Sequence, residues 1–151
     1  MSLLLLKPEL DQWKPGEHTG TFRGNNLAFV AATQAFNYWK TDDLTKAIET
    51  KSILVKEKLQ EIKEAHTDLQ LSVRGRGLIF GLEVPARGLA TEISKEAFSN
   101  GLVIEVSGAR DDVLKLIPPL IIDDSDLEKG ISIINQSIES VVKKQGEKVM
   151  I

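Results

Sequence analysis

The sequence predicts an α/β (α+β) fold in which a small sheet is covered by helices. Amphipathic stretches with helical spacing occur in two parts of the chain, and short apolar stretches bounded by glycine or proline lie between them. The 151 residues suit one ordinary domain, and 42% hydrophobic with 27% charged residues is the balance of a globular protein.

Two helices are expected in the first half of the chain. Asn25 or Asn26 can cap a helix that runs to about Trp39. Thr41, which two aspartates follow, can cap a second helix. Spacings of four, three, four and three give this second helix one amphipathic face, made by Ile48, Ser52, Val55, Leu59 and Ile62.

Two more helices are expected in the second half. A short one should end at Asn100-Gly101, and its inward positions are Leu89, Ile93 and Ala97. The last helix should begin with a capping box formed by Ser125 and Glu128. Its apolar face would be made by Leu127, Ile131, Ile134, Ile138 and Val141.

Four apolar runs are expected to be strands. They are Leu3–Leu6, a buried stretch from Leu78 to Val84, Leu102–Val106 and Val113–Ile117. The first run is far in sequence from the other three, so its sheet neighbours are not evident. We therefore expect Leu3–Leu6 and the Pro8–Gly20 loop to be poorly anchored or to make intermolecular contacts.

Composition excludes several classes of function. A net charge of −3 argues against a nucleic-acid partner, and the apolar runs are too short to span a membrane. The absence of cysteine excludes thiol catalysis and thiolate metal sites, and it fits a cytoplasmic protein. His18 and His66 stand alone and are interpreted as surface residues. Asp123, Asp124 and Asp126 are interpreted as an acidic helix start, so no metal site is expected.

Two segments nevertheless have the character of binding sites. Gly20–Ala28 puts the Thr21 hydroxyl and Arg23 just before a helix N-terminus, where an anion such as phosphate is favoured. An ordinary capped loop is the alternative. Val73–Glu83 places three glycines beside a buried strand, which lets another backbone or a ligand approach closely. A glycine-kinked core strand is the alternative there.

These segments, in this order, resemble the class III aminotransferases, which are pyridoxal-phosphate enzymes of fold type I. The third matching motif is Val113–Ile122, with its Pro118-Pro119 pair before the last helix. The resemblance implies that residues 41–151 are a connecting helix and the C-terminal small domain, a small and mostly antiparallel sheet covered by helices. Residues 1–40 would be a remnant of the large cofactor domain.

The resemblance also implies roles for single residues. Gly20 and Thr21 would bind the cofactor phosphate in the neighbouring subunit's site, across a homodimer interface. Lys115 matches the arginine that grips the substrate α-carboxylate, although lysine lacks the planar fork of arginine. Arg74 and Arg76 would be turn and packing residues.

No catalytic residue is expected in the chain, because the family's Schiff-base lysine lies shortly before the matching stretch. The chain alone should therefore be inactive and should not hold pyridoxal phosphate stably. Its expected partner is the missing N-terminal part of the subunit.

Lys7–Gly16, Gly20–Phe29 and Lys115 resemble one branch of the family, which transfers the amino group of glutamate to aspartate semialdehyde in ectoine biosynthesis. Two alternatives remain. A free-standing binding module would not need the large-domain remnant at residues 3–20. A member acting on ornithine or 4-aminobutyrate would carry arginine in place of Lys115.

Overall fold

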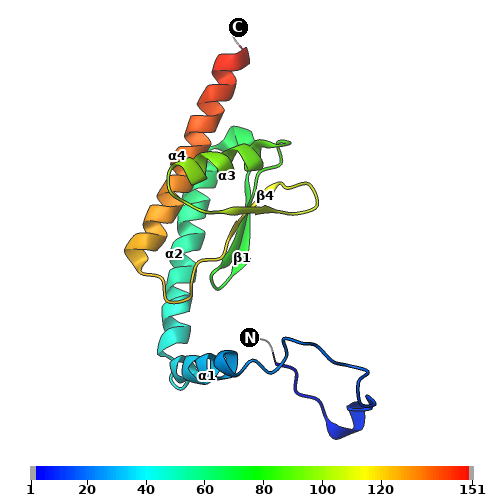
Figure 1. The fold of residues 1–151 in the computed structure, drawn as a ribbon. Helices are drawn as coiled ribbons and strands as arrows, with labels where there is room; N and C mark the ends of the chain where they lie inside the picture. Colours follow the sequence, from blue (N-terminus) through cyan, green and yellow to red (C-terminus); the bar gives the residue numbers. More distant parts are fainter. Residues whose placement is uncertain (1–2, 150–151) are drawn as a thin grey trace. The chain divides into compact units, whose positions relative to one another are not determined.

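The computed structural model describes residues 3–149 and forms two compact units, 1–44 and 45–151 (Figure 1). Each unit is described separately. Among the described residues, no helix combines the length and the apolar character needed to cross a membrane.

The first unit begins with an extended segment that belongs to no sheet. The prediction that Leu3–Leu6 is a strand is wrong: the four leucines are extended, and 43% to 85% of each is exposed. A strand needs backbone N–H and C=O partners on a neighbouring strand. The only sheet in residues 3–149 is built from residues 72–116, so these leucines have no such neighbour.

The rest of this unit is a loop followed by a helix. The loop contains the 3₁₀ turn η1 (Pro8–Leu10), and the rings of Trp13 and His18 meet edge to face with centroids 4.8 Å apart. Helix α1 (Asn26–Ala35) continues as the 3₁₀ turn η2 (Phe36–Trp39), as the sequence predicted. No side chain between residues 3 and 44 is buried.

In the second unit, helix α2 (Asp43–Ala65) carries the predicted amphipathic face. Val55, Leu59 and Ile62 are buried, and Ile48 and Ser52 on the same face are half-buried. At its start, the Thr41 hydroxyl donates to the Asp43 carboxylate over 2.9 Å. The turn η3 (Thr67–Leu69) then leads from α2 to the sheet.

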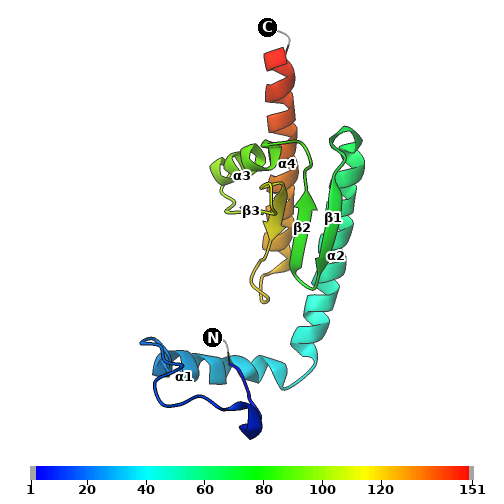
Figure 2. The same cartoon turned by 90° about the vertical axis from the view of Figure 1, so that its right-hand side faces the viewer.

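The sheet has four antiparallel strands in the order β1-β2-β4-β3, which confirms the predicted antiparallel sheet (Figure 2). The strands are β1 (Ser72–Arg76), β2 (Ile79–Glu83), β3 (Glu105–Ser107) and β4 (Val113–Leu116). The sequence reading missed β1, because its polar residues show no apolar alternation and it is an edge strand of the sheet.

The β1–β2 hairpin explains two of the glycines. Gly77 turns the chain with φ +58, a conformation that side chains disfavour. Gly75 lies opposite Phe80, and a Cβ atom added there would be 2.4 Å from the Phe80 ring. The space beside Gly75 is therefore filled by the hairpin's own aromatic ring, and not by a ligand.

Helices α3 (Leu89–Ser99) and α4 (Asp124–Val149) complete the unit. The predicted capping box is wrong: α4 begins at Asp124, so Ser125 lies inside the first turn. The residue before the helix is Asp123, whose carbonyl accepts from Leu127 N over 3.0 Å. In both views α2 and α4 run beside each other on one side of the sheet. The core contains Leu59, Leu82, Ile93, Leu114, Ile134 and Ile138.

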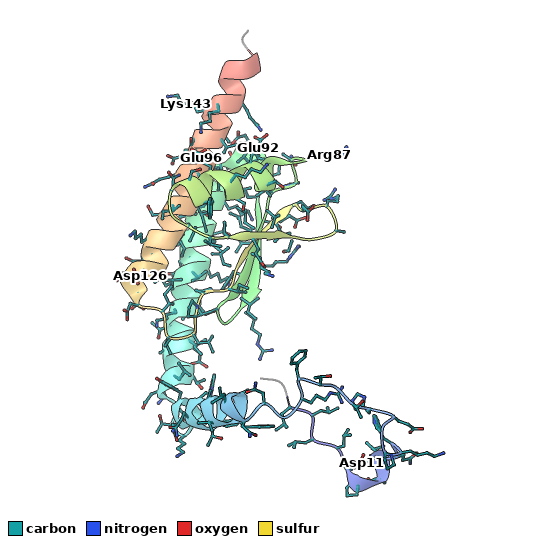
Figure 3. All side chains as sticks on the ribbon, in the orientation of Figure 1. Asp11, Arg87, Glu92, Glu96, Asp126 and Lys143 are labelled. Carbon is teal, nitrogen blue, oxygen red and sulfur yellow. The ribbon has the colours of Figure 1, made fainter. Side chains whose placement is uncertain are left out.

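A polar network joins α3 to α4. Glu96 accepts from Ser140 Oγ and from Lys144 Nζ, each over 2.7 Å, and the amide of Gln145 donates to Glu92 over 2.9 Å (Figure 3). The hydrogen bond from Lys144, followed by that from Ser140, lowers the pKa of the Glu96 carboxyl below its ordinary value of 4.5.

Candidate functional site

The first candidate site is the loop before α1. Residues 21–24 form a turn, in which Arg23 N donates to the Gly20 carbonyl over 3.0 Å. Gly24 has φ +74, the left-handed conformation that favours glycine. The Arg23 guanidinium donates to the His18 carbonyl over 3.1 Å, so this side chain lies along the loop.

The helix that follows is capped by its own loop. Asn25 Oδ1 accepts from Ala28 N over 2.9 Å, which confirms Asn25 as the cap. Its side chain satisfies one of the free N–H groups of the first turn, and the positive end of the helix dipole remains at this end.

The donors of this loop fit a phosphate group. The Thr21 hydroxyl and the Arg23 side chain are both exposed, and residues 18–28 include no acidic side chain. A hydroxyl, a guanidinium and backbone N–H groups near a helix start are a suitable set of donors for a phosphate dianion. Gly20 also suits its place, since an added Cβ atom would be 3.1 Å from Arg23 Nε.

The second candidate residue, Lys115, lies in the middle of β4. Glu105 on β3 is its direct cross-strand partner, and Lys115 Nζ is 2.7 Å from Glu105 Oε2. The side chains are 36% and 66% exposed. The hydrogen bond from Lys115, followed by its charge, lowers the pKa of the Glu105 carboxyl.

This pair lies on the polar face of the sheet. Strand residues alternate between faces, so Lys115 and Glu105 lie on the face opposite to Leu114 and Leu116, which are buried. On the same polar face the Arg74 guanidinium is 3.0 Å from the Glu83 carboxylate. Arg74 is thus a packing partner within the hairpin, whereas Arg76 is exposed.

The Lys115 ammonium therefore has a carboxylate partner within its own sheet. A substrate carboxylate at this place would share the ammonium with Glu105 or displace it. The sequence reading identified Lys115 and missed Glu105, because strand register, and not spacing along the chain, makes them neighbours.

Both side chains border an apolar pocket of about 420 Å³. The segment that leads into β3 and the first turns of α4 form its walls. Its apolar lining residues include Leu102, Val103, Ile104, Leu116, Ile117, Pro118, Leu127, Ile131 and Ile134.

The remaining residues considered from the sequence form no further site. His18 is exposed as predicted, but His66 is half-buried, and its Nε2 is 3.1 Å from Asn135 Oδ1. Within residues 3–149 no cluster of histidine and carboxylate side chains has the arrangement of a metal site. Gly20 and Thr21 belong to the unit 1–44, and Lys115 belongs to the unit 45–151.

Comparison with known proteins identifies the family. The family model described as "Aminotransferase class-III" matches residues 6–138. The chain belongs to the class III aminotransferase family. It is 52% identical over 145 residues to the diaminobutyrate–2-oxoglutarate transaminase of Wolinella succinogenes, covering 96% of this chain and 34% of that protein. The protein of the same name from Oceanobacillus iheyensis is 53% identical over 144 residues, covering 95% and 34%.

The solved structures agree with this class III assignment. The ornithine aminotransferase from Toxoplasma gondii, whose active site is partially occupied by pyridoxal phosphate, has a TM-score of 0.72 and 27% identity. The match covers 88% of this chain and 31% of that chain. The resemblance stated from the sequence is confirmed, and the chain spans about a third of the length of the curated relatives it matches.

Proposed function

We propose that this chain forms the small-domain part of a diaminobutyrate–2-oxoglutarate transaminase. Such an enzyme moves an amino group from glutamate to aspartate semialdehyde and yields 2,4-diaminobutyrate and 2-oxoglutarate. The observation that supports the proposal is 52% and 53% identity, over 96% and 95% of the chain, to two proteins of that name. The role in ectoine biosynthesis and a cytoplasmic location are part of the same proposal.

Pyridoxal phosphate is the cofactor that this function implies, and when bound it supplies the electron sink for amino-group exchange. In this chain, the Thr21 hydroxyl and the backbone N–H groups that follow Gly20 would hold its phosphate, and Arg23 would add positive charge. We propose that this loop serves the neighbouring subunit of a homodimer, as the family resemblance implies.

Lys115 would neutralise a carboxylate of the substrate. Its ammonium is a point charge, so it would attract the carboxylate without the two-pronged geometry of an arginine. Glu105, 2.7 Å away, would compete for the same ammonium and weaken this contact.

The test is a hybrid enzyme in which residues 6–138 replace the matching segment of the Wolinella succinogenes relative. We expect the hybrid to form 2,4-diaminobutyrate from aspartate semialdehyde with glutamate as donor, measured by chromatography of the products. A folded, dimeric hybrid that uses only ornithine or 4-aminobutyrate as donor would contradict the proposal.

The phosphate role of Thr21 is tested in the same hybrid. Thr21→Ala should weaken cofactor binding by roughly tenfold or more, because a hydrogen bond to a charged group is lost. The matched control is Thr33→Ala, since the Thr33 hydroxyl bonds only to the Phe29 carbonyl of its own helix. Equal affinities of the two variants would refute the role.

The chain by itself should form no specific covalent adduct with pyridoxal phosphate after borohydride reduction, because none of its lysines has the sequence context of the family's cofactor-bonding lysine. Mass spectrometry of the reduced chain measures this. A saturable adduct on one lysine would show that the proposal wrongly denies the chain such a residue.

A further inference from the structure

Leu3–Leu6 presents an uncovered apolar segment. These leucines are 65%, 77%, 85% and 43% exposed, and the segment is extended. Its backbone makes none of the hydrogen bonds found in residues 3–149, where the first begins at the Lys7 carbonyl. Water-exposed leucines with free backbone groups favour association with an apolar surface that also offers a strand edge.

The unit 45–151 offers such a surface. The apolar pocket of about 420 Å³ lies beside Glu105, the first residue of β3, and β3 is an edge strand of the sheet. At the rim, Val103 is 80% exposed and Ile117 is 53% exposed. We call this pocket and its rim the β3 groove.

The shape and charge of the β3 groove suit the leucine segment. An extended peptide that lies between a sheet edge and a helix is a common form of strand addition. Lys7, directly after the leucines, adds a positive charge. Asp126 lines the groove on the first turn of α4 and takes part in none of the ion pairs among the described residues (Figure 3).

We propose that Leu3–Leu6 of one copy of this chain docks in the β3 groove of a second copy. The leucines fill the apolar pocket, and Lys7 lies near Asp126. The two surfaces differ, so the contact is heterologous, and each dimer keeps one free segment and one free groove. The chain therefore associates beyond the dimer as its concentration rises.

Sedimentation velocity over a concentration series tests this proposal. Leu4→Glu removes the segment and Val103→Glu removes the groove, and both positions are exposed, so the fold is kept. Each substitution should lower the association constant by roughly tenfold or more, since one buried leucine or valine contributes at least that factor.

Mixing these two variants gives the sharpest result. Each keeps one intact surface, so the mixture should form 1:1 dimers that do not grow further, although neither variant associates alone. The matched controls are Phe98→Glu on α3 and Leu27→Glu on α1, which are 68% and 80% exposed in the wild type and lie outside both surfaces. Both controls should associate as the wild type does.

Three results would overturn the proposal. They are a wild-type chain that stays monomeric at every concentration, association that survives Leu4→Glu or Val103→Glu, and a mixture that forms no heterodimer. Loss of association in Leu27→Glu alone would assign the contact to α1 instead. The transaminase proposal is unaffected by any of these results, because it is tested in the hybrid enzyme.

Discussion

The two units of this chain use similar local signals with different results. Helix α1 has a side-chain cap and helix-favouring alanines, yet no residue between 3 and 44 is buried. Helix α2 has an apolar face of comparable clarity, and its Leu59 is fully buried against the sheet and α4. Local signals are thus enough to form a helix, whereas stability comes from burying its apolar face.

Hydrogen exchange measured by NMR should separate the units most strongly. Core amides in β2 and β4 should exchange only through global unfolding, which costs about 5–15 kcal/mol in ordinary domains. Amides of α1 should exchange orders of magnitude faster, because no buried contact protects them. Equal protection of α1 and β2 would break the comparison.

Core truncation should show the next largest effect. Leu114→Ala should lower the free energy of unfolding by about 2–5 kcal/mol, because the side chain is fully buried. Leu27→Ala, at a site 80% exposed on α1, should change it by less than about 0.5 kcal/mol. Urea unfolding followed by circular dichroism measures both, and similar losses would contradict the view that only the second unit has a core.

Two glycine substitutions sharpen the comparison within the second unit. Gly75→Ala should destabilise it by about 1–3 kcal/mol, because the new methyl group overlaps the Phe80 ring. Gly130→Ala should stabilise α4 by about 0.5–1 kcal/mol, because the nearest atom outside the helix is a Leu102 methyl at 3.7 Å. Thermal unfolding should move in opposite directions for the two variants, and a shift of the same sign would be inconsistent with this packing.

The smallest expected effect is a pH dependence at Glu96. The folded-state pKa of Glu96 is lowered, so its contribution is complete above the ordinary value of 4.5 and is lost as pH falls through the folded-state value. Glu96→Gln should therefore be less stable than wild type at pH 7 and equal to it at low pH. Urea midpoints measured from pH 7 to pH 3 test this, and Glu61→Gln on α2 is a control away from the α3–α4 network.

The helices were largely predictable because their hydrogen bonds and side-chain periodicity are local. Four- and three-residue spacings identified the buried faces of α2 and α4. The start of α4 was misplaced, since Ser125 has the right residue type for a cap but Asp123 holds the position before the helix.

Strands and site geometry were less predictable because they depend on distant partners. Leu3–Leu6 has the composition of a strand and lacks a neighbour, whereas Ser72–Arg76 has a polar composition and pairs with β2. The loop at Gly20 and Thr21 was recognisable from contiguous residues. The Lys115–Glu105 pair was not, because only the register of β3 against β4 brings the two residues together.

The loop lengths of the sheet have a consequence for folding kinetics. The turn between β1 and β2 and the loop of residues 108–112 between β3 and β4 are short, so each hairpin closes at a small entropic cost. The central β2–β4 pairing joins the hairpins across residues 84–112, which include α3. We therefore expect the hairpins to form first, and the slowest step to be the meeting of Phe80 and Leu82 with Leu116 and Leu114 in the middle of the sheet.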